Sequence, residues 1–204
     1  MMHGIGVFEF ACHLSAERVT AMKVLCDLQT WRSALFIVGF LLPFNIRCAF
    51  ADTILKGHRG FVHDVAYSPD GSLLASAGWD STVRLWNSSD GKLVATLGGS
   101  SGHEKYVWSV SFSPDGRYLL SCAGDHFAKV WDVANRSLVR TLRGHRWAVR
   151  HCTFSSDGLS AFTSSSDGIR MWEVSSGEQI RHFDLSAAAA IAVSPDGSTL
   201  ATGH

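Results

Sequence analysis

The sequence predicts an all-β protein in which a unit of four short strands repeats along the chain. Three recurring features support this prediction. A turn tetrapeptide, Ser-Pro-Asp-Gly or Ser-Ser-Asp-Gly, occurs at four positions separated by 45, 42 and 39 residues and begins at Ser68, Ser113, Ser155 and Ser194. A Gly-His pair precedes each of the first three copies, with the histidines at His58, His103 and His145. A tryptophan closes the same units at 28, 28 and 27 residues after the histidine, at Trp86, Trp131 and Trp172.

Each unit is predicted to hold four strands joined by tight turns. In the first unit, the strand Val62–Tyr67 leads into the turn Ser68–Gly71, whose second-position Pro and fourth-position Gly are typical of a type I turn. The other predicted strands of this unit are Leu73–Ala77, Thr82–Trp86 and Lys92–Leu97. The same order recurs from 107 to 142 and from 149 to 183, which leaves no room for a long helix.

Gly-His, Ser-Pro-Asp-Gly and Trp-Asp at this period resemble the WD-repeat β-propeller family, over residues 53–204. Only Trp131-Asp132 is the literal closing pair, and Trp86-Asn87 and Trp172-Glu173 are close variants. The resemblance implies a partial WD-repeat β-propeller with three complete four-stranded blades and part of a fourth. Its units lie at about 53–97, 102–142, 144–183 and 187–204.

The same resemblance implies a hydrogen-bonded chain of a His, an Asp, a hydroxyl and the Trp within each blade. The matching positions are His58, Ser76, Asp80 and Trp86 in the first unit and His103, Ser121, Asp125 and Trp131 in the second. The third unit keeps His145, Asp167 and Trp172, but one residue is missing before the Trp, which leaves Thr163 or Ser164 as the hydroxyl. Half-buried polar groups are costly unless they are paired, so we expect a structural role.

We expect no catalytic site, because a catalytic triad needs one nucleophile at a pocket and this trio recurs in every unit. The ten histidines show no H-x-x-x-H spacing and the cysteines no C-x-x-C spacing, so we expect no metal site and no cofactor. A formal net charge of zero without a basic run also argues against a nucleic-acid partner.

Propellers bind partners through loops and strand ends at one rim, and aromatic and Arg residues dominate binding hot spots. The candidates that the repeat does not need for its own network are His63, Trp79, Tyr106, Trp108, Trp147 and Arg150. The alternative for Trp108 and Trp147 is packing between blades. The predicted function is a non-enzymatic protein-protein interaction scaffold that binds protein or peptide partners at the rim. The alternative is the propeller portion of a longer exported enzyme or sensor whose catalytic or haem-binding region is absent from this chain.

Residues 1–51 are predicted to be an N-terminal extension and signal peptide. The apolar run Ala34–Phe44 is too short for a membrane span but fits a signal, and Ala49-Phe50-Ala51 predicts cleavage after Ala51. A start at Met22 gives a signal of normal proportions. We therefore expect an exported, periplasmic or secreted protein of bacterial source, without stable membrane insertion after cleavage. The alternative is that this run forms a buried helix or a short signal anchor, and the location is cytoplasmic if the segment is not a functional signal.

The mature part, residues 52–204, is expected to be an incomplete ring that is truncated at its C-terminus. Thr53–Lys56 matches Arg140–Arg143 and therefore predicts an outer strand without a partner blade, and a fourth unit begins after Asp184 and stops before its closing Trp. The two remaining cysteines, Cys122 and Cys152, are expected to be buried free thiols rather than a disulfide.

Overall fold

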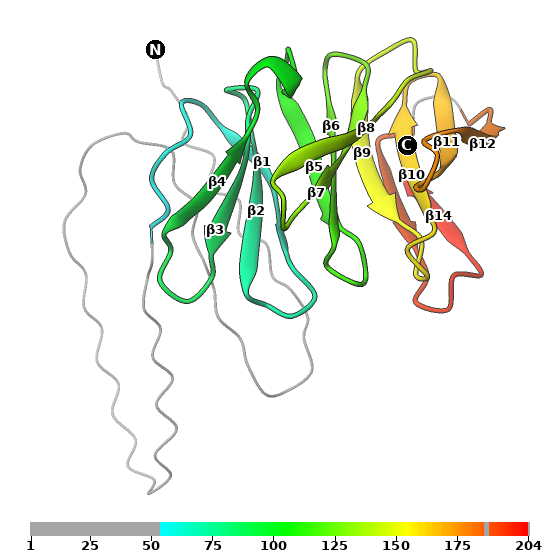
Figure 1. Cartoon of the computed structure of the whole chain (residues 1–204). Helices are drawn as coiled ribbons and strands as arrows, with labels where there is room; N and C mark the ends of the chain where they lie inside the picture. The colour runs from blue at the N-terminus through cyan, green and yellow to red at the C-terminus, as the bar shows by residue number, and fades with distance from the viewer. Residues whose placement is uncertain (1–53, 186–187, 204) are drawn as a thin grey trace, which may run out of the picture.

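The computed structural model describes residues 54–185 and 188–203, which form an arc of antiparallel sheets (Figure 1). The predicted all-β class and partial propeller are confirmed: three sheets have four strands each, hydrogen-bonded in chain order, and a fourth has two. Blade 1 contains β1 Val62–Tyr67, β2 Leu73–Gly78, β3 Val83–Asn87 and β4 Leu93–Leu97. Blade 2 contains β5 Val107–Phe112, β6 Tyr118–Ala123, β7 Ala128–Asp132 and β8 Ser137–Leu142.

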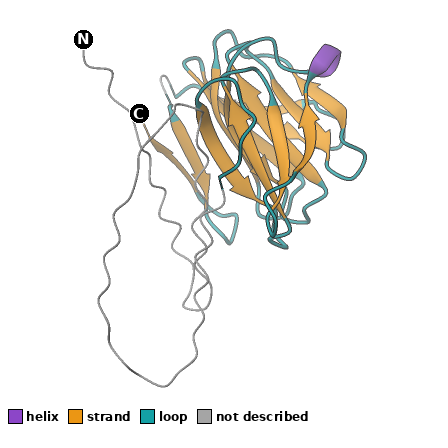
Figure 2. Ribbon diagram, turned by 90° about the vertical axis from the view of Figure 1, so that its left-hand side faces the viewer, coloured by secondary structure: helices purple, strands orange, loops and turns teal. Residues whose placement is uncertain are grey.

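Blade 3 contains β9 Val149–Phe154, β10 Ser160–Ser165, β11 Gly168–Glu173 and β12 Gln179–Phe183. The two strands of blade 4 are β13 Ala190–Val193 and β14 Leu200–Gly203. In the part of the chain that the structure describes, the only helical element is the short 3-10 turn η1, Gly99–Ser101, between blades 1 and 2 (Figure 2). The first strands β1, β5, β9 and β13 lie next to one another in this order.

Each repeated tetrapeptide closes the hairpin between the first two strands of its blade. In blade 1 the Ser68 hydroxyl donates to Asp70 Oδ1 at 2.6 Å and accepts from the backbone N–H of Leu73 at 2.9 Å. Gly71 then takes a φ of 70°, which favours glycine. Equivalent hydroxyl bonds occur at Ser113, Ser155 and Ser194.

The predicted strands of blade 1 differ from the observed ones at their ends: β2 extends to Gly78 rather than Ala77, β3 ends at Asn87 rather than Trp86, and β4 begins at Leu93 rather than Lys92. β3 begins at Val83 rather than Thr82, because the Thr82 hydroxyl donates to Asp80 Oδ1 at 2.7 Å and belongs to the turn. Residues 54–56 of the predicted outer strand are in no strand. Leu55 from this segment is only 2% exposed and packs with Leu74 and Trp86.

Apolar side chains between neighbouring blades form the core. Leu85 of blade 1 and Leu119 of blade 2 are fully buried in one cluster, and Val130 of blade 2 and Trp172 of blade 3 are buried in the next. This packing brings residues that are far apart in the sequence together where neighbouring blades meet.

Both described cysteines are free and buried. Burial raises the pKa of the Cys122 thiol well above its ordinary value, with a further contribution from neighbouring Cys152. A protonated, buried thiol is unreactive. The signal, start and cleavage predictions concern residues that lie outside the described ones. Among the described residues, no helix has the length and apolar character needed to cross a membrane.

Candidate partner-binding site

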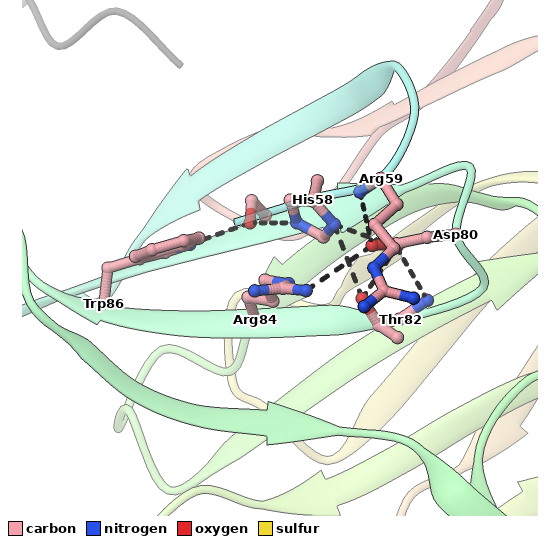
Figure 3. A network of polar contacts seen from close by, with 7 residues as sticks. His58, Arg59, Asp80, Thr82, Arg84 and Trp86 are labelled. Atoms are coloured by element: carbon pink, nitrogen blue, oxygen red, sulfur yellow. Dashed lines mark hydrogen bonds and ion pairs between the residues drawn. The ribbon is translucent and has the colours of Figure 1, made fainter. Parts of the chain in front are cut away.

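A chain of hydrogen bonds links the start of blade 1 to its third strand (Figure 3). His58 Nδ1 lies 2.9 Å from Asp80 Oδ1, and His58 Nε2 lies 2.7 Å from Ser76 Oγ. The indole N–H of Trp86 donates to the same Ser76 oxygen at 2.8 Å. The loop before β1, the strand β2, the β2–β3 turn and the strand β3 are therefore fastened together through four side chains.

The donors of this chain are all satisfied only when His58 is neutral. The Trp86 N–H donates to Ser76 Oγ, the Ser76 O–H donates to His58 Nε2, and the His58 Nδ1–H donates to Asp80. A second proton on Nε2 would leave the Ser76 hydrogen without this acceptor. Burial lowers the pKa of His58, against the raising effect of Asp80, and so favours the neutral form.

The carboxylate of Asp80 also holds the loop. Burial by itself raises its pKa, but the backbone N–H of Arg59, the Thr82 hydroxyl and His58 outweigh this and hold the pKa at about 2. The Arg59 N–H donates to Asp80 Oδ2 at 3.0 Å. Asp80 is therefore an ionised acceptor inside the fold.

The same geometry recurs in blades 2 and 3. In blade 2, His103 lies 2.8 Å from both Asp125 Oδ2 and Ser121 Oγ, and the Trp131 N–H donates to Ser121 at 2.8 Å. In blade 3 the His145 Nδ1–Asp167 Oδ1 distance is 2.6 Å.

The structure places Thr163, not Ser164, in the chain of blade 3. Thr163 Oγ1 lies 2.7 Å from His145 Nε2 and accepts from the Trp172 N–H at 2.8 Å, whereas Ser164 Oγ is buried without a partner. The missing residue shortens the β10–β11 turn, where Gly168 takes a φ of 111°. In the longer turns of blades 1 and 2 the left-handed positions are Ser81 and His126.

Sequence reasoning missed a basic residue that recurs at the same position in each of the first three blades. Arg84 Nη2 lies 3.6 Å from Asp80 Oδ2, and Arg170 Nη2 lies 3.1 Å from Asp167 Oδ2. At the equivalent place, the Lys129 ammonium donates to the carbonyl oxygens of Ser101 and Gly102 at 2.7 and 2.6 Å. All three stand two residues before the closing Trp, a regularity that could have revealed them.

These networks are suited to holding the fold rather than to chemistry. Each bridging hydroxyl already holds both the His and the Trp of its blade, and Ser76, Ser121 and Thr163 are each 0% exposed. A substrate therefore has no access to them. Within residues 54–185 and 188–203, no group of three or more His, Cys, Asp or Glu residues is placed to hold a metal ion.

Four of the six predicted binding residues meet where blades 1 and 2 join, together with a fifth aromatic residue. Trp79 stacks on Tyr106 with 4.8 Å between ring centroids and 19° between planes. Trp108 meets the edge of Trp79 at 6.3 Å, and His63 lies 4.5 Å from Trp108. Phe61, which sequence reasoning missed, packs edge-on against Trp79 at 5.1 Å. We call Phe61, His63, Trp79, Tyr106 and Trp108 the aromatic cluster.

The backbone fixes the position of the aromatic cluster. The Trp79 N–H donates to the Phe61 carbonyl at 2.9 Å, and the Gly124 N–H donates to the Tyr106 carbonyl at 2.9 Å in the same way one blade further on. Phe61 nevertheless leaves 65% of its surface exposed and Tyr106 leaves 48%. The cluster is therefore both held in place and open to solvent.

Packing between blades does not require the stacked pair of Trp79 and Tyr106, whereas Trp108 does pack against the buried core between blades 2 and 3, which is the alternative expected for this residue. At the junction of blades 2 and 3, the position of Trp79 is taken by Gly124, and the position of Tyr106 is taken by Ala148. These two blades still pack around a buried core. The stacked pair is a property of one junction rather than of the repeat.

The other two predicted binding residues lie on blade 3. Trp147, in the loop before β9, is 60% exposed, and Arg150, within β9, is exposed. No ring contact joins Trp147 to the aromatic cluster among the described residues.

Comparison with known proteins finds a family model that matches this chain. Three segments of the chain, residues 51–87, 91–132 and 136–173, match the family model described as "WD domain, G-beta repeat". A Chaetomium thermophilum protein named "Ribosome assembly protein 4" is 55% identical over 40 residues, which is 20% of this chain and 8% of that protein.

A second relative is "Small ribosomal subunit protein RACK1y" of Oryza sativa subsp. japonica. It is 53% identical over 45 residues, which cover 22% of this chain and 13% of the relative. The match thus spans a small part of either relative's length. Among solved structures, "Structure of U3-55K" aligns with a TM-score of 0.64 and 24% identity, covering 67% of this chain and 44% of that one. That likeness concerns the fold alone.

Proposed function

This chain belongs to the WD40 repeat family, and we propose that it is a non-catalytic scaffold that binds protein or peptide partners at the rim carrying the aromatic cluster. The observation that supports this most strongly is the stack of Trp79 on Tyr106, 4.8 Å apart and formed between two blades. Aromatic side chains that are rigid and partly exposed are typical of binding hot spots.

The rim can offer a partner both shape and rigidity. Trp79 is held by the backbone bond to Phe61 and by ring contacts on several sides, so little side-chain freedom remains to be lost on binding. The exposed rings of Phe61 and Tyr106 supply apolar surface that a partner can cover. The His–Asp–hydroxyl–Trp chains hold the loops that carry these rings.

Site-specific photo-crosslinking tests the proposal. A photoreactive phenylalanine analogue at Phe61 is compared with the same analogue at Tyr67, an aromatic residue that is 45% exposed at the opposite end of β1. Both forms are exposed to extract from the organism of origin. We expect defined crosslinked bands at Phe61 that disappear when unlabelled chain competes, and none of these bands at Tyr67.

The Tyr106→Ala variant of the Phe61 probe supplies the control for the aromatic cluster. Loss of the same bands, with unchanged circular dichroism, supports binding through the cluster. Identical bands at Phe61 and Tyr67, or bands that resist competition, contradict the proposal because they indicate nonspecific contact.

A further inference from the structure

We propose that the partner segment seated on the aromatic cluster is acidic, with Asp or Glu side chains on either side of an apolar or aromatic residue. This inference rests on the proposed function and names the chemistry of the partner. It depends on which charges at the rim are already paired within the fold and which are left open.

The carboxylates near the aromatic cluster already accept hydrogen bonds from other groups of the fold. Asp64 Oδ1 accepts the N–H of Val65 at 2.8 Å, and its Oδ2 accepts the N–H of Val110 in the next blade at 3.0 Å. Asp80 and Asp125 bind His58 and His103 and also accept the backbone N–H groups of Arg59 and Glu104. These acidic groups stabilise the loops and are not presented to a partner.

The basic groups of the same loops are not committed. Four exposed basic residues follow the Gly-His histidines: Arg59, Lys105, Arg146 and Arg150. Within the described part of the chain, none of the four makes an ion pair. Glu104 is the only exposed acidic residue between each of these histidines and the fifth residue after it. The loops therefore present an excess of positive charge although the whole chain is formally neutral.

Two of these basic residues lie in the loops that carry rings of the aromatic cluster. Arg59 is two residues before Phe61 in the loop that leads into β1, and Lys105 precedes Tyr106. The side chain of Lys105 runs past Gly124 close to the Trp108 indole, since a Cβ built on Gly124 would lie 3.4 Å from Lys105 Cβ and 3.5 Å from Trp108 Nε1. Cations in the two loops that carry the exposed rings match carboxylates on either side of an apolar side chain.

A peptide fits this surface better than a nucleic acid does. The best-placed ring faces, those of Trp79 and Tyr106, already stack on each other, so bases cannot intercalate between them without breaking that contact. Four separate cations on a neutral chain also give a small phosphate-neutralising surface.

Selection from a phage-displayed random peptide library tests the inference without knowledge of the natural partner. The library is eluted in parallel from the whole chain and from its Tyr106→Ala variant. We expect the peptides that only the unaltered chain retains to carry net negative charge around an apolar or aromatic residue. A neutral or basic set of retained peptides overturns the acidic partner.

Binding of one selected peptide, measured by fluorescence anisotropy, separates charge from aromatic contact. The Arg59→Gln, Lys105→Gln double variant should bind about tenfold more weakly, and the difference should shrink as salt is raised. Lys92→Gln, at an exposed lysine in the β3–β4 turn, is the charge control. Leu93→Ala matches Tyr106→Ala in side-chain exposure, because both residues are 48% exposed.

The outcomes distinguish this inference from the proposed function. If Tyr106→Ala abolishes binding while the double charge variant binds like the unaltered chain, the rim is a binding site but the partner is not chosen by its acidity. If the selection yields no peptide that the unaltered chain retains and the Tyr106→Ala variant does not, Tyr106 does not contribute to peptide binding and both statements fail. A single-stranded oligonucleotide is also tested as a competitor. If it displaces the labelled peptide at a lower concentration than the unlabelled peptide requires, the assignment of a peptide partner is overturned.

Discussion

The indole of Trp86 and the imidazole of His58 meet on one hydroxyl oxygen, since Trp86 Nε1 lies 2.8 Å and His58 Nε2 lies 2.7 Å from Ser76 Oγ. Ser76 is fully buried, and Trp86 and His58 are only 2% and 8% exposed, so this bridge is shielded from solvent. This single hydroxyl therefore fixes the positions of two side chains of blade 1, those of His58 and Trp86.

Replacing Ser76 with Ala should lower the free energy of unfolding by about 2–4 kcal/mol, because the change leaves two buried nitrogen groups without their shared partner. Urea unfolding followed by tryptophan fluorescence measures the loss. Ser100→Ala, at an exposed position of η1, should have no measurable effect. Equal stability of the two variants would show that the hydroxyl bridge contributes nothing.

Acidification should destabilise the folded chain from about neutral pH downward. Burial lowers the pKa of His58 and, in the same way, the pKa of His145 below the ordinary value of 6.5. As the pH decreases through 6.5, the unfolded chain therefore binds more protons than the folded chain does. The free energy of unfolding decreases as the pH is lowered. Asp80, whose pKa is about 2, keeps its contribution until the pH is much lower.

Urea unfolding at about pH 7.5 and about pH 5.5 measures this dependence. His58→Gln should be less stable than the unaltered chain at the higher pH but should lose less on acidification, because one of the titrating groups is gone. Ser100→Ala, at an exposed position of η1, should keep the original dependence. A chain that is more stable at the lower of the two pH values than at the higher one contradicts the neutral-histidine network.

The sequence could predict the blades because their signals are local. The Ser68–Gly71 turn, the Gly-His pair and the closing Trp each determine structure within a few residues, and each recurs. The stack of Trp79 on Tyr106 was not predictable as a contact, because it depends on how two blades pack together. The sequence could name both residues as candidates, but it could not pair them.

The basic residue two positions before each closing Trp shows a different limit of sequence-based prediction. Arg84, Lys129 and Arg170 recur at one place in the repeat, so their regularity was visible. The group that each of them binds was not visible in the sequence. Arg84 and Arg170 pair with the Asp of their blade, whereas Lys129 donates to the carbonyls of Ser101 and Gly102. The 3-10 turn in front of blade 2 changes the acceptors within reach.

Lys129→Met should destabilise the 3-10 turn η1. The ammonium of Lys129 donates to Ser101 and Gly102, and both carbonyls would lose this partner, at a cost of about 1–3 kcal/mol in the free energy of unfolding. Hydrogen exchange should accelerate at the Gly102 N–H, which bonds to the Gly99 carbonyl. Lys92→Met, at an exposed residue, is the control and should leave exchange at Gly102 unchanged.

Export can be tested separately from the fold, because the predicted signal lies outside the described residues. Expression in the organism of origin followed by N-terminal sequencing of the secreted or periplasmic chain should give Asp52 as the first residue. A cytoplasmic chain that retains residues 22–51 contradicts the prediction. The binding proposals do not depend on this outcome, since their residues lie between Arg59 and Arg150, after the predicted cleavage site.

Gly168 is the residue that lets blade 3 keep its network with one residue fewer in the β10–β11 turn. Its φ is 111°, and a Cβ built there would lie 2.3 Å from the Phe183 carbonyl oxygen and 2.9 Å from His182 Nε2. Gly168→Ala should therefore cost about 2–4 kcal/mol of unfolding free energy, through backbone strain and displacement of β12. Gly71→Ala has comparable left-handed strain, with a φ of 70°, but no atom within 4 Å of the added carbon. It should cost only about 1 kcal/mol. Equal losses in the two variants, measured by urea unfolding, would show that the shortened turn relaxes around the new methyl group and that the close approach to Phe183 is not needed.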